Sequence, residues 1–366
     1  MSLTTDAAAR LAVDRWPDLP QAVKYGVAER VGDRLFTGLG SAGAAFFCFP
    51  LNARSAAWQT CAPFPGIPPS GAACAASRGR IYIFGGSGAA PGRKTPTVLD
   101  AIHCFDPATN AWHQLATLPP CGLLGAKARP LSDGRILVLG GYSKPVFDEL
   151  QEALAQAPIE QRPMLLRHFM SQPPAFYGWN DNMLLFDPTD LSWTVLEQNP
   201  LGATCESSLH TVGADRFALC SGEIKPGLRQ PDCVEIAIGD AEVTATALPP
   251  IPPVPGETAS EGLAGACGGM IRGQLHLVGG TNFAGARARA SAGLWFAHDG
   301  LKKRWLDHIL ALTPDGWVLA GHLPHGIAYG AVFAVDPGLL IAGGERPDGQ
   351  ASNECLFVYP AVRKQT

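Results

Sequence analysis

A short apolar stretch that ends in a pair of glycines recurs along this 366-residue chain. The clearest copy is IYIFGG at 81–86, and a second apolar stretch, a tryptophan and a Leu-Pro dipeptide follow it within 100–120. The last glycine of each unit falls at positions 40, 86, 141, 222, 280 and 344. Their mean spacing of about 61 residues compares with about 50 for a kelch unit. In two units another residue, Leu39 or Ser221, replaces the first glycine.

Each unit has the pattern of four short antiparallel strands, with the glycine pair at the end of the second strand. Because one unit is too small to bury its own apolar faces, the units must pack against one another. We therefore predict an all-β fold, a six-bladed kelch-type β-propeller that occupies residues 1–366 as a single domain. The tryptophan of each unit is expected to pack between neighbouring blades.

The two ends of the chain predict how the ring closes. The sixth unit stops at Tyr359-Pro360 with six residues after it, so it lacks a fourth strand. The N-terminal segment VDRWPDLP at 13–20 has the Trp and Leu-Pro of a fourth strand, yet it precedes any first strand. We expect residues 13–20 to complete the last blade, because an open ring would leave a strand edge unpaired.

Three long segments follow the glycine pairs of the third, fourth and fifth units, at 142–181, 223–232 and 281–305. Since strand direction alternates within a blade, these segments leave by the same face of the propeller. Apolar residues at helical spacing within 142–181 predict a helical insertion in blade three. Long loops on a rigid scaffold are common places for function. The insertion is expected to act either as a lid or as simple packing.

Charge and composition exclude several classes of protein. A formal net charge of −4 provides no basic surface for nucleic acid. No apolar stretch approaches the roughly 20 residues of a membrane-spanning helix, and the N-terminus lacks the apolar core of a signal peptide. The ten cysteines are scattered singly, as expected for small buried residues. We expect a cytoplasmic protein, unless a native leader has been removed, and the sequence allows a homodimer.

The position directly after each glycine pair is polar in all six units. Its occupants are Ser41, Ser87, Tyr142, Glu223, Thr281 and Glu345. A further carboxylate, Glu206, precedes the fourth unit, and Arg229 shares one short loop with Glu223. The sequence shows no nucleophile elbow, phosphate-binding loop or histidine-rich metal motif. We therefore expect acid/base chemistry by carboxylates on a small molecule, without a cofactor or metal.

Several motifs resemble those of the bacterial N-acetylneuraminate epimerases, also called sialic acid mutarotases. They are GLGSAG (38–43), GEIKPGLR (222–229), AHDGLKK (297–303), AYG (328–330) and IAGGE (341–345). The resemblance implies a propeller that interconverts the α and β anomers of a sialic acid. It also implies that Glu223 is the acid/base residue and that Arg229 is the partner of the substrate carboxylate. Family members often reside in the periplasm.

Further substrate contacts are predicted from the same loops, at Arg287, Glu345, Ser41, Tyr142 and Lys302. The resemblance also implies polar groups where several first strands begin. Here those positions are apolar or small, at Pro69, Ser70, Gly71, Ala126 and Ile327. Part of the substrate-contacting shell is therefore expected to differ, with another acidic keto-sugar as an alternative substrate. The other hypothesis is a non-catalytic kelch module that binds a protein or a glycan, because the fold alone does not separate the two.

Overall fold

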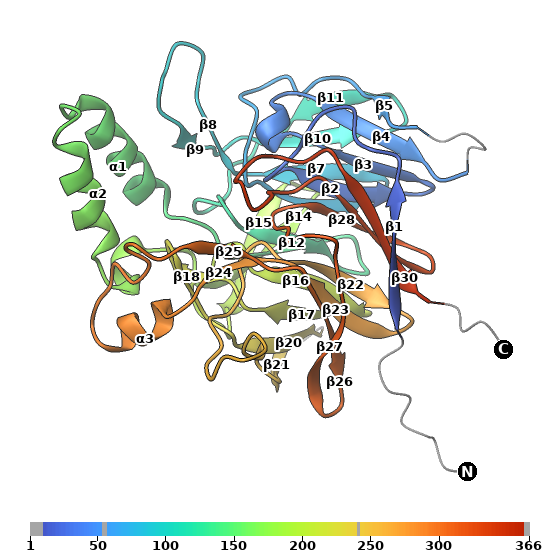
Figure 1. Cartoon of the computed structure of the whole chain (residues 1–366). Coiled ribbons are helices and arrows are strands. Elements are labelled where there is room, and N and C mark those ends of the chain that lie inside the picture. The colour runs from blue at the N-terminus through green and yellow to red at the C-terminus, as the bar shows by residue number, and fades with distance from the viewer. Residues whose placement is uncertain (1–9, 53–56, 240–241, 362–366) are drawn as a thin grey trace.

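Six four-stranded antiparallel sheets are arranged as blades around a central axis (Figure 1). The computed structural model describes residues 10–52, 57–239 and 242–361. From the innermost to the outermost strand, blade one consists of β2 (Val27–Val31), β3 (Arg34–Gly38), β4 (Phe46–Pro50) and β5 (Gln59–Thr60). In the same order, blade two consists of β6 (Ala73–Ser77), β7 (Arg80–Phe84), β10 (Ile102–Asp106) and β11 (Ala111–Gln114). Blade three consists of β12 (Lys127–Pro130), β13 (Ile136–Leu139), β14 (Asn182–Asp187) and β15 (Ser192–Gln198). Blade four consists of β16 (Ser208–Gly213), β17 (Arg216–Cys220), β20 (Cys233–Ile238) and β21 (Val243–Leu248). Blade five consists of β22 (Cys267–Ile271), β23 (Gln274–Val278), β26 (His308–Thr313) and β27 (Gly316–His322). Blade six consists of β28 (Ala331–Val335), β29 (Gly338–Ala342), β30 (Cys355–Pro360) and β1 (Leu11–Trp16).

The N-terminal strand closes the ring, as the sequence predicted. Strand β1 pairs antiparallel with β30, from Leu11 opposite Pro360 to Trp16 opposite Cys355. Figure 1 shows β1 and β30, from opposite ends of the chain, side by side. The strand begins two residues before the predicted segment and ends at Trp16. Beyond it, the Leu19 amide still donates to the Asn353 carbonyl, at 2.8 Å.

Aromatic residues fill the spaces between blades. Trp112 of blade two packs against Phe46 of blade one, with ring centroids 5.0 Å apart. Its indole nitrogen donates to the carbonyl of Ala62, in the segment that connects the two blades. Trp193 of blade three lies likewise against Phe84 of blade two. The recurring tryptophan therefore joins neighbouring blades, as predicted, and the core of the protein is a series of inter-blade layers.

The glycine pairs keep their backbone shape even where the sequence departs from glycine. Leu39 and Ser221 hold φ at 60° and 58°, in the left-handed region. At the equivalent Gly140 of blade three, a Cβ would lie 2.2 Å from the carbonyl oxygen of Thr204. The turn is thus required by the close approach of the next blade's linker, and glycine is the residue that enters it without strain.

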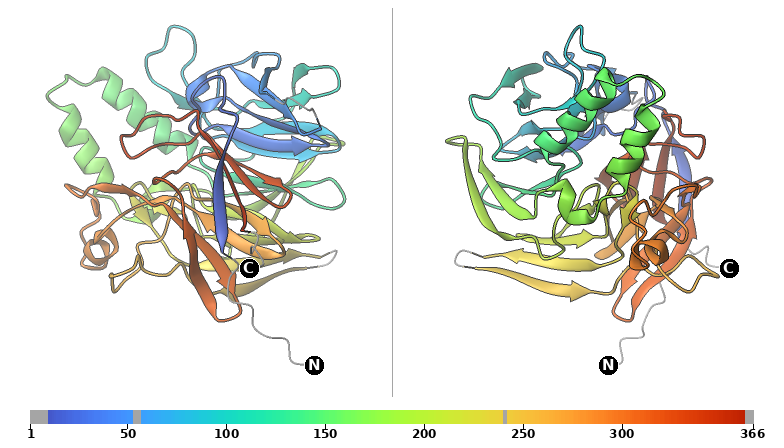
Figure 2. Two further views of the ribbon diagram at one scale, coloured as in Figure 1. Left: turned by 45° about the vertical axis from the view of Figure 1, so that its right-hand side comes forward. Right: turned by 90° about the vertical axis from the view of Figure 1, so that its left-hand side faces the viewer.

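One face of the propeller carries the elaborated loops. Their strand pairs are β8 (Ser87–Gly88) with β9 (Thr97–Val98), β18 (Glu223–Lys225) with β19 (Leu228–Arg229), and β24 (Thr281–Phe283) with β25 (Lys303–Trp305). Their helices are α1 (Lys144–Gln156), α2 (Arg162–Met170) and α3 (Ala286–Ser291), with 3₁₀ turns at Pro174–Tyr177 and, in blade one, Gly40–Ala42. The right-hand view of Figure 2 shows α1, α2 and α3 in front of the ring. None of the described helices is long and apolar enough to span a membrane.

Candidate active site

A closed ring of six backbone hydrogen bonds surrounds the propeller axis. Each blade contributes the residue that lies two positions before its innermost strand. In order around the ring, these residues are Tyr25, Gly71, Gly125, Glu206, Gly265 and Tyr329. The amide of each donates to the carbonyl of the ring residue in the preceding blade, at 2.7–3.1 Å, and Tyr25 completes the circle by donating to Tyr329. All six have φ between 51° and 76°.

The left-handed backbone of this ring is easy for glycine and costly for larger residues, at about 1–2 kcal/mol each. The three larger ring residues, Tyr25, Glu206 and Tyr329, all line a cavity of about 410 Å³. Glycine at 265 makes room for one of them, because a Cβ there would lie 2.2 Å from Cδ1 of Tyr329. Strained residues that face a cavity in this way often mark a functional site.

Glu223 and Arg229 form an ion pair at the wall of this cavity. They are directly opposite one another in the β18–β19 hairpin, with Glu223 Oε1 2.8 Å from Arg229 Nη2. Both side chains are largely buried, at 12% and 4% exposure. The hairpin turns at Gly227, where a Cβ would lie 1.9 Å from Nδ1 of His298. The close packing of His298 therefore fixes how the hairpin presents its carboxylate.

Burial and charge act in opposite directions on this carboxylate. Burial raises the pKa of Glu223 above its ordinary value, while the Arg229 guanidinium and the Gly227 amide oppose the increase. Arg229 also lies over the ring of Phe283, at 4.8 Å. Its Nε and Nη1 are buried without a hydrogen-bond partner among the described residues. Glu223 is thus a carboxyl group that is partly biased toward its protonated form, beside a cation that has donors to spare.

Two further carboxylates pair with lysines around the same cavity. Glu206 accepts a hydrogen bond from Lys127 Nζ at 2.7 Å. Behind the cavity wall, Glu345 pairs with Lys24 at 2.8 Å and with Lys303 at 2.5 Å. Together with the Glu223–Arg229 pair, the cluster has four cations and three carboxylates. When all are ionised, one positive charge remains, which favours an anionic ligand.

The loops of blades three, four and five meet at this cavity. Tyr142, Phe147 and Met170 of the helical insertion line it, together with Phe283 and Lys303 of blade five. Lys225 connects all three loops, because its fully buried ammonium donates to the carbonyls of Met170 and Trp295, at 2.6 and 2.5 Å. The predicted convergence of these loops on the propeller axis is therefore observed.

Known proteins share this architecture along nearly the whole chain. The family model described as N-acetylneuraminate epimerase matches residues 16–359. The chain belongs to the N-acetylneuraminate epimerase family. It is 41% identical over 362 residues to the N-acetylneuraminate epimerase of Brucella melitensis, covering 98% of this chain and 93% of the relative. Identity to the Vibrio vulnificus protein of that name is 37% over 352 residues, covering 95% and 91%. The solved structure titled "Structure of YjhT" superposes with a TM-score of 0.88 at 29% identity, covering 96% of this chain and 98% of that one.

Within this epimerase-family site, the structure brings together some of the predicted residues. Glu223, Arg229 and Tyr142 line the cavity. Glu345 lies one layer behind it, where its carboxylate contacts Lys303 and accepts hydrogen bonds from Trp305 Nε1 and the Tyr25 hydroxyl. It supports cavity residues but does not line the cavity.

The other three predicted substrate contacts lie outside the cavity lining. Ser41 instead caps the backbone, since its hydroxyl accepts a hydrogen bond from the Lys24 amide. Arg287 belongs to the first turn of α3, whose amides are held by the Glu261 carboxylate. Lys302 is exposed, whereas its neighbour Lys303 begins β25 and lines the cavity. The lysine that lines the cavity is therefore Lys303, and the predicted contact at Lys302 lies one residue before β25, outside the lining.

The positions named as apolar or small, where the first strands begin, lie next to polar groups, most of which the sequence analysis did not single out. Ser70 and Gly71 line the cavity, and polar groups are present at the ring positions Tyr25, Glu206 and Tyr329. Lys127 adds a charge directly after Ala126. The sequence carried one signal that could have identified the ring. It is the recurring position two residues before each innermost strand, which is occupied only by glycine, tyrosine or glutamate.

Proposed function

We propose that this protein accelerates the interconversion of the α and β anomers of N-acetylneuraminate, with Glu223 as the group that transfers protons. The observation that carries the proposal is the buried Glu223–Arg229 pair at the wall of an axial cavity, in a chain of this family. The relatives' names indicate the substrate, and the excess positive charge around the cavity suits a sugar that carries a carboxylate.

The reaction needs two proton movements. A base removes the proton of the anomeric hydroxyl at C2, and an acid delivers a proton to the ring oxygen as the C2–O bond breaks. The open-chain ketone then rotates about C2–C3, and the hydroxyl formed from the ring oxygen attacks the other face of the carbonyl. During this ring closure the two proton transfers run in reverse. A positioned carboxylate contributes roughly 10²–10⁴-fold to such a step. The raised pKa of Glu223 suits a carboxyl group that must both accept and donate a proton near neutral pH.

Charged residues of the cavity wall have separate roles in this proposal. The arginine and lysine side chains that line the cavity are Arg229 and Lys303. His298 also lines it, but burial lowers the pKa of this histidine to about 4 and so keeps it neutral. We assign the substrate carboxylate to these two cations, with Arg229 also holding Glu223 in place. Glu206, from the backbone ring, is the second carboxylate and serves as the complementary proton-transfer group.

The test follows anomer exchange by NMR in freshly dissolved N-acetylneuraminate, with the spontaneous rate subtracted. Wild-type protein should raise the exchange rate, and Glu223→Gln should abolish the increase while thermal unfolding stays cooperative. Glu235→Gln is the matched control, because Glu235 also pairs with an arginine, Arg216, at 2.6 Å, but on an exposed blade surface. Wild-type protein that leaves the rate unchanged for a panel of acidic keto-sugars would instead favour a binding module.

A further inference from the structure

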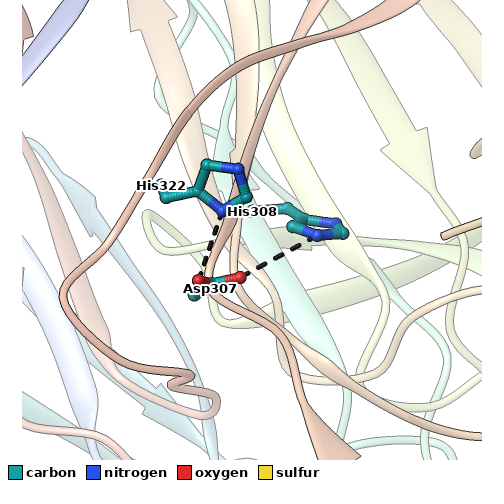
Figure 3. Close-up of side chains that lie close together, drawn as sticks. All are labelled: Asp307, His308 and His322. Carbon is teal, nitrogen blue, oxygen red and sulfur yellow. Dashed lines mark ion pairs between the residues drawn. The ribbon is translucent and has the colours of Figure 1, made fainter. Parts of the chain in front are cut away.

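Two histidines and an aspartate meet at the outer edge of blade five, away from the cavity. Figure 3 shows the imidazoles of His308 and His322 turned toward the carboxylate of Asp307. His308 Nε2 lies 3.8 Å from one carboxylate oxygen, and His322 Nδ1 lies 3.2 Å from the other. One carboxylate therefore faces two imidazole nitrogens, and the three ligand atoms all lie within 4.8 Å of one another.

The backbone holds these three residues in fixed positions. His308 begins β26 and His322 ends β27, where they are direct cross-strand partners. The Leu323 amide donates to the Asp307 carbonyl at 2.7 Å, and the Gly279 amide donates to the His308 carbonyl at 2.9 Å. Pairing thus continues on both sides of the histidines. A site built on paired strands needs little rearrangement to bind a ligand.

The spacing of the donor atoms is close to the spacing around a small tetrahedral cation. With metal–nitrogen and metal–oxygen bonds of about 2.0–2.2 Å, neighbouring ligand atoms of tetrahedral Zn²⁺ lie about 3.3–3.5 Å apart. The two nitrogen–oxygen separations, 3.2 Å from His322 and 3.8 Å from His308, involve different oxygens of Asp307 and lie on either side of that range, and no two of the three ligand atoms are more than 4.8 Å apart. Imidazole nitrogens with one carboxylate suit Zn²⁺ and similar transition metals, whereas Mg²⁺ and Ca²⁺ prefer oxygen ligands alone.

We propose that Asp307, His308 and His322 form a Zn²⁺ site that joins the last two strands of blade five. Three protein ligands leave a coordination position for water. Asp307 and His322 are 41% and 52% exposed in their side chains, so the ion enters directly from solvent. The site lies at the end of the β26–β27 pair that faces the elaborated loops, two residues after β25, which carries Lys303. Bound Zn²⁺ therefore stabilises the blade that supplies one wall of the cavity.

The experiment titrates Zn²⁺ into tag-free protein by calorimetry and compares thermal unfolding with and without the ion. Wild-type protein should bind one Zn²⁺ per chain and unfold at a higher temperature in its presence. His322→Asn and Asp307→Asn should each weaken the binding by at least about tenfold and remove the thermal shift. Mg²⁺ should produce neither effect. In Zn²⁺-soaked crystals, an anomalous peak should lie between the three side chains.

His325→Asn is the matched control. His325 also pairs with a carboxylate, Glu354 at 2.5 Å, but without a second histidine, so this variant should bind Zn²⁺ like wild type. The comparison is needed because the described residues include ten free cysteines, which can also bind Zn²⁺. The proposal is overturned if wild-type protein binds no Zn²⁺, or if His322→Asn and Asp307→Asn bind it as tightly as wild type.

Discussion

Replacement of Lys225 by methionine tests whether a buried ammonium holds the active-site loops together. Methionine keeps an unbranched apolar stem but removes the donors to the carbonyls of Met170 and Trp295. Each lost charge-assisted hydrogen bond costs about 1.5–3 kcal/mol. Against this, burial lowers the pKa of Lys225 from 10.5 to about 8. Compared with a neutral amine in the same place, the charged lysine therefore destabilises the fold by about 3 kcal/mol at pH 7. The net change at pH 7 is thus a modest loss of stability.

The sharper expectation concerns pH. Because the folded-state pKa of Lys225 is lower than the unfolded value, the unfolded chain binds more protons between about pH 8 and 10.5, and stability from this group rises with pH. From pH 7 to 9.5, wild type should gain about 2 kcal/mol relative to Lys225→Met. Urea unfolding of both proteins at the two pH values measures this, since other titrating groups cancel in the difference.

Hydrogen exchange adds a local reading of the same change. In Lys225→Met, amides of α2 and of the segment around Trp295 should exchange faster, while amides of the distant blade two should not change. The reasoning is refuted if the stability difference between wild type and variant does not vary with pH, or if exchange increases uniformly over the whole propeller.

Three further changes test other parts of the structure. Gly265→Ala should displace the Tyr329 ring and lower the rate of anomer exchange. Gly349→Ala is its control, because Gly349 has φ of 77° but open space around it, so this variant should cost only the backbone strain of about 1–2 kcal/mol and leave the exchange rate intact. Equal activity of the two variants would contradict this expectation. Burial acts to raise the pKa of Glu345, but Lys24 and Lys303 hold it below its ordinary value, so Glu345→Gln should destabilise the protein above pH 4.5. That loss, measured by urea unfolding, should shrink as pH falls through the lowered pKa, and a loss that grows on acidification would argue against the ion pairs. Trp16→Ala removes contacts with Phe49 and Phe357 at the closing strand and should cost about 2 kcal/mol; an unchanged urea midpoint would show that closure does not depend on it.

The fold could be predicted because the repeated pattern and the backbone geometry have the same cause. Each glycine pair marks a place where the next blade's linker approaches closely, so the pattern recurs wherever that contact recurs. The orphan segment around Trp16 was recognisable for the same reason, since its tryptophan matches those that pack between blades. The Glu223–Arg229 pair was also accessible, because a single short hairpin brings both residues to one place.

Other parts of the site depend on strand phase and on contacts between distant blades. The choice between Lys302 and Lys303 requires knowing where β25 begins. The roles of Tyr25 and Tyr329 emerge only when the six blades meet at the axis. Likewise, His308 and His322 become partners through a strand pairing that contains a register shift next to His308. For the ring tyrosines the sequence offers a recurring position two residues before each innermost strand, whereas for the lysine and the histidines it offers no local motif.

In the hydrogen-bonded ring around the propeller axis, main-chain atoms build the structure, whereas side chains determine the chemistry of the cavity. Only main-chain atoms make the circle, so each blade offers one side-chain position whose identity can change while the circle stays intact. In this chain three of the six positions are vacant, at Gly71, Gly125 and Gly265, and the occupied ones place two phenols and a carboxyl group unevenly around the axis. A nearly six-fold scaffold thereby presents a lopsided floor, which can hold a chiral sugar in one orientation. Asparagine and aspartate tolerate the same backbone shape, so Gly71 and Gly125, where an added Cβ would meet no atom closer than 3.0 Å, are the positions at which a relative could acquire a different specificity without rebuilding its blades.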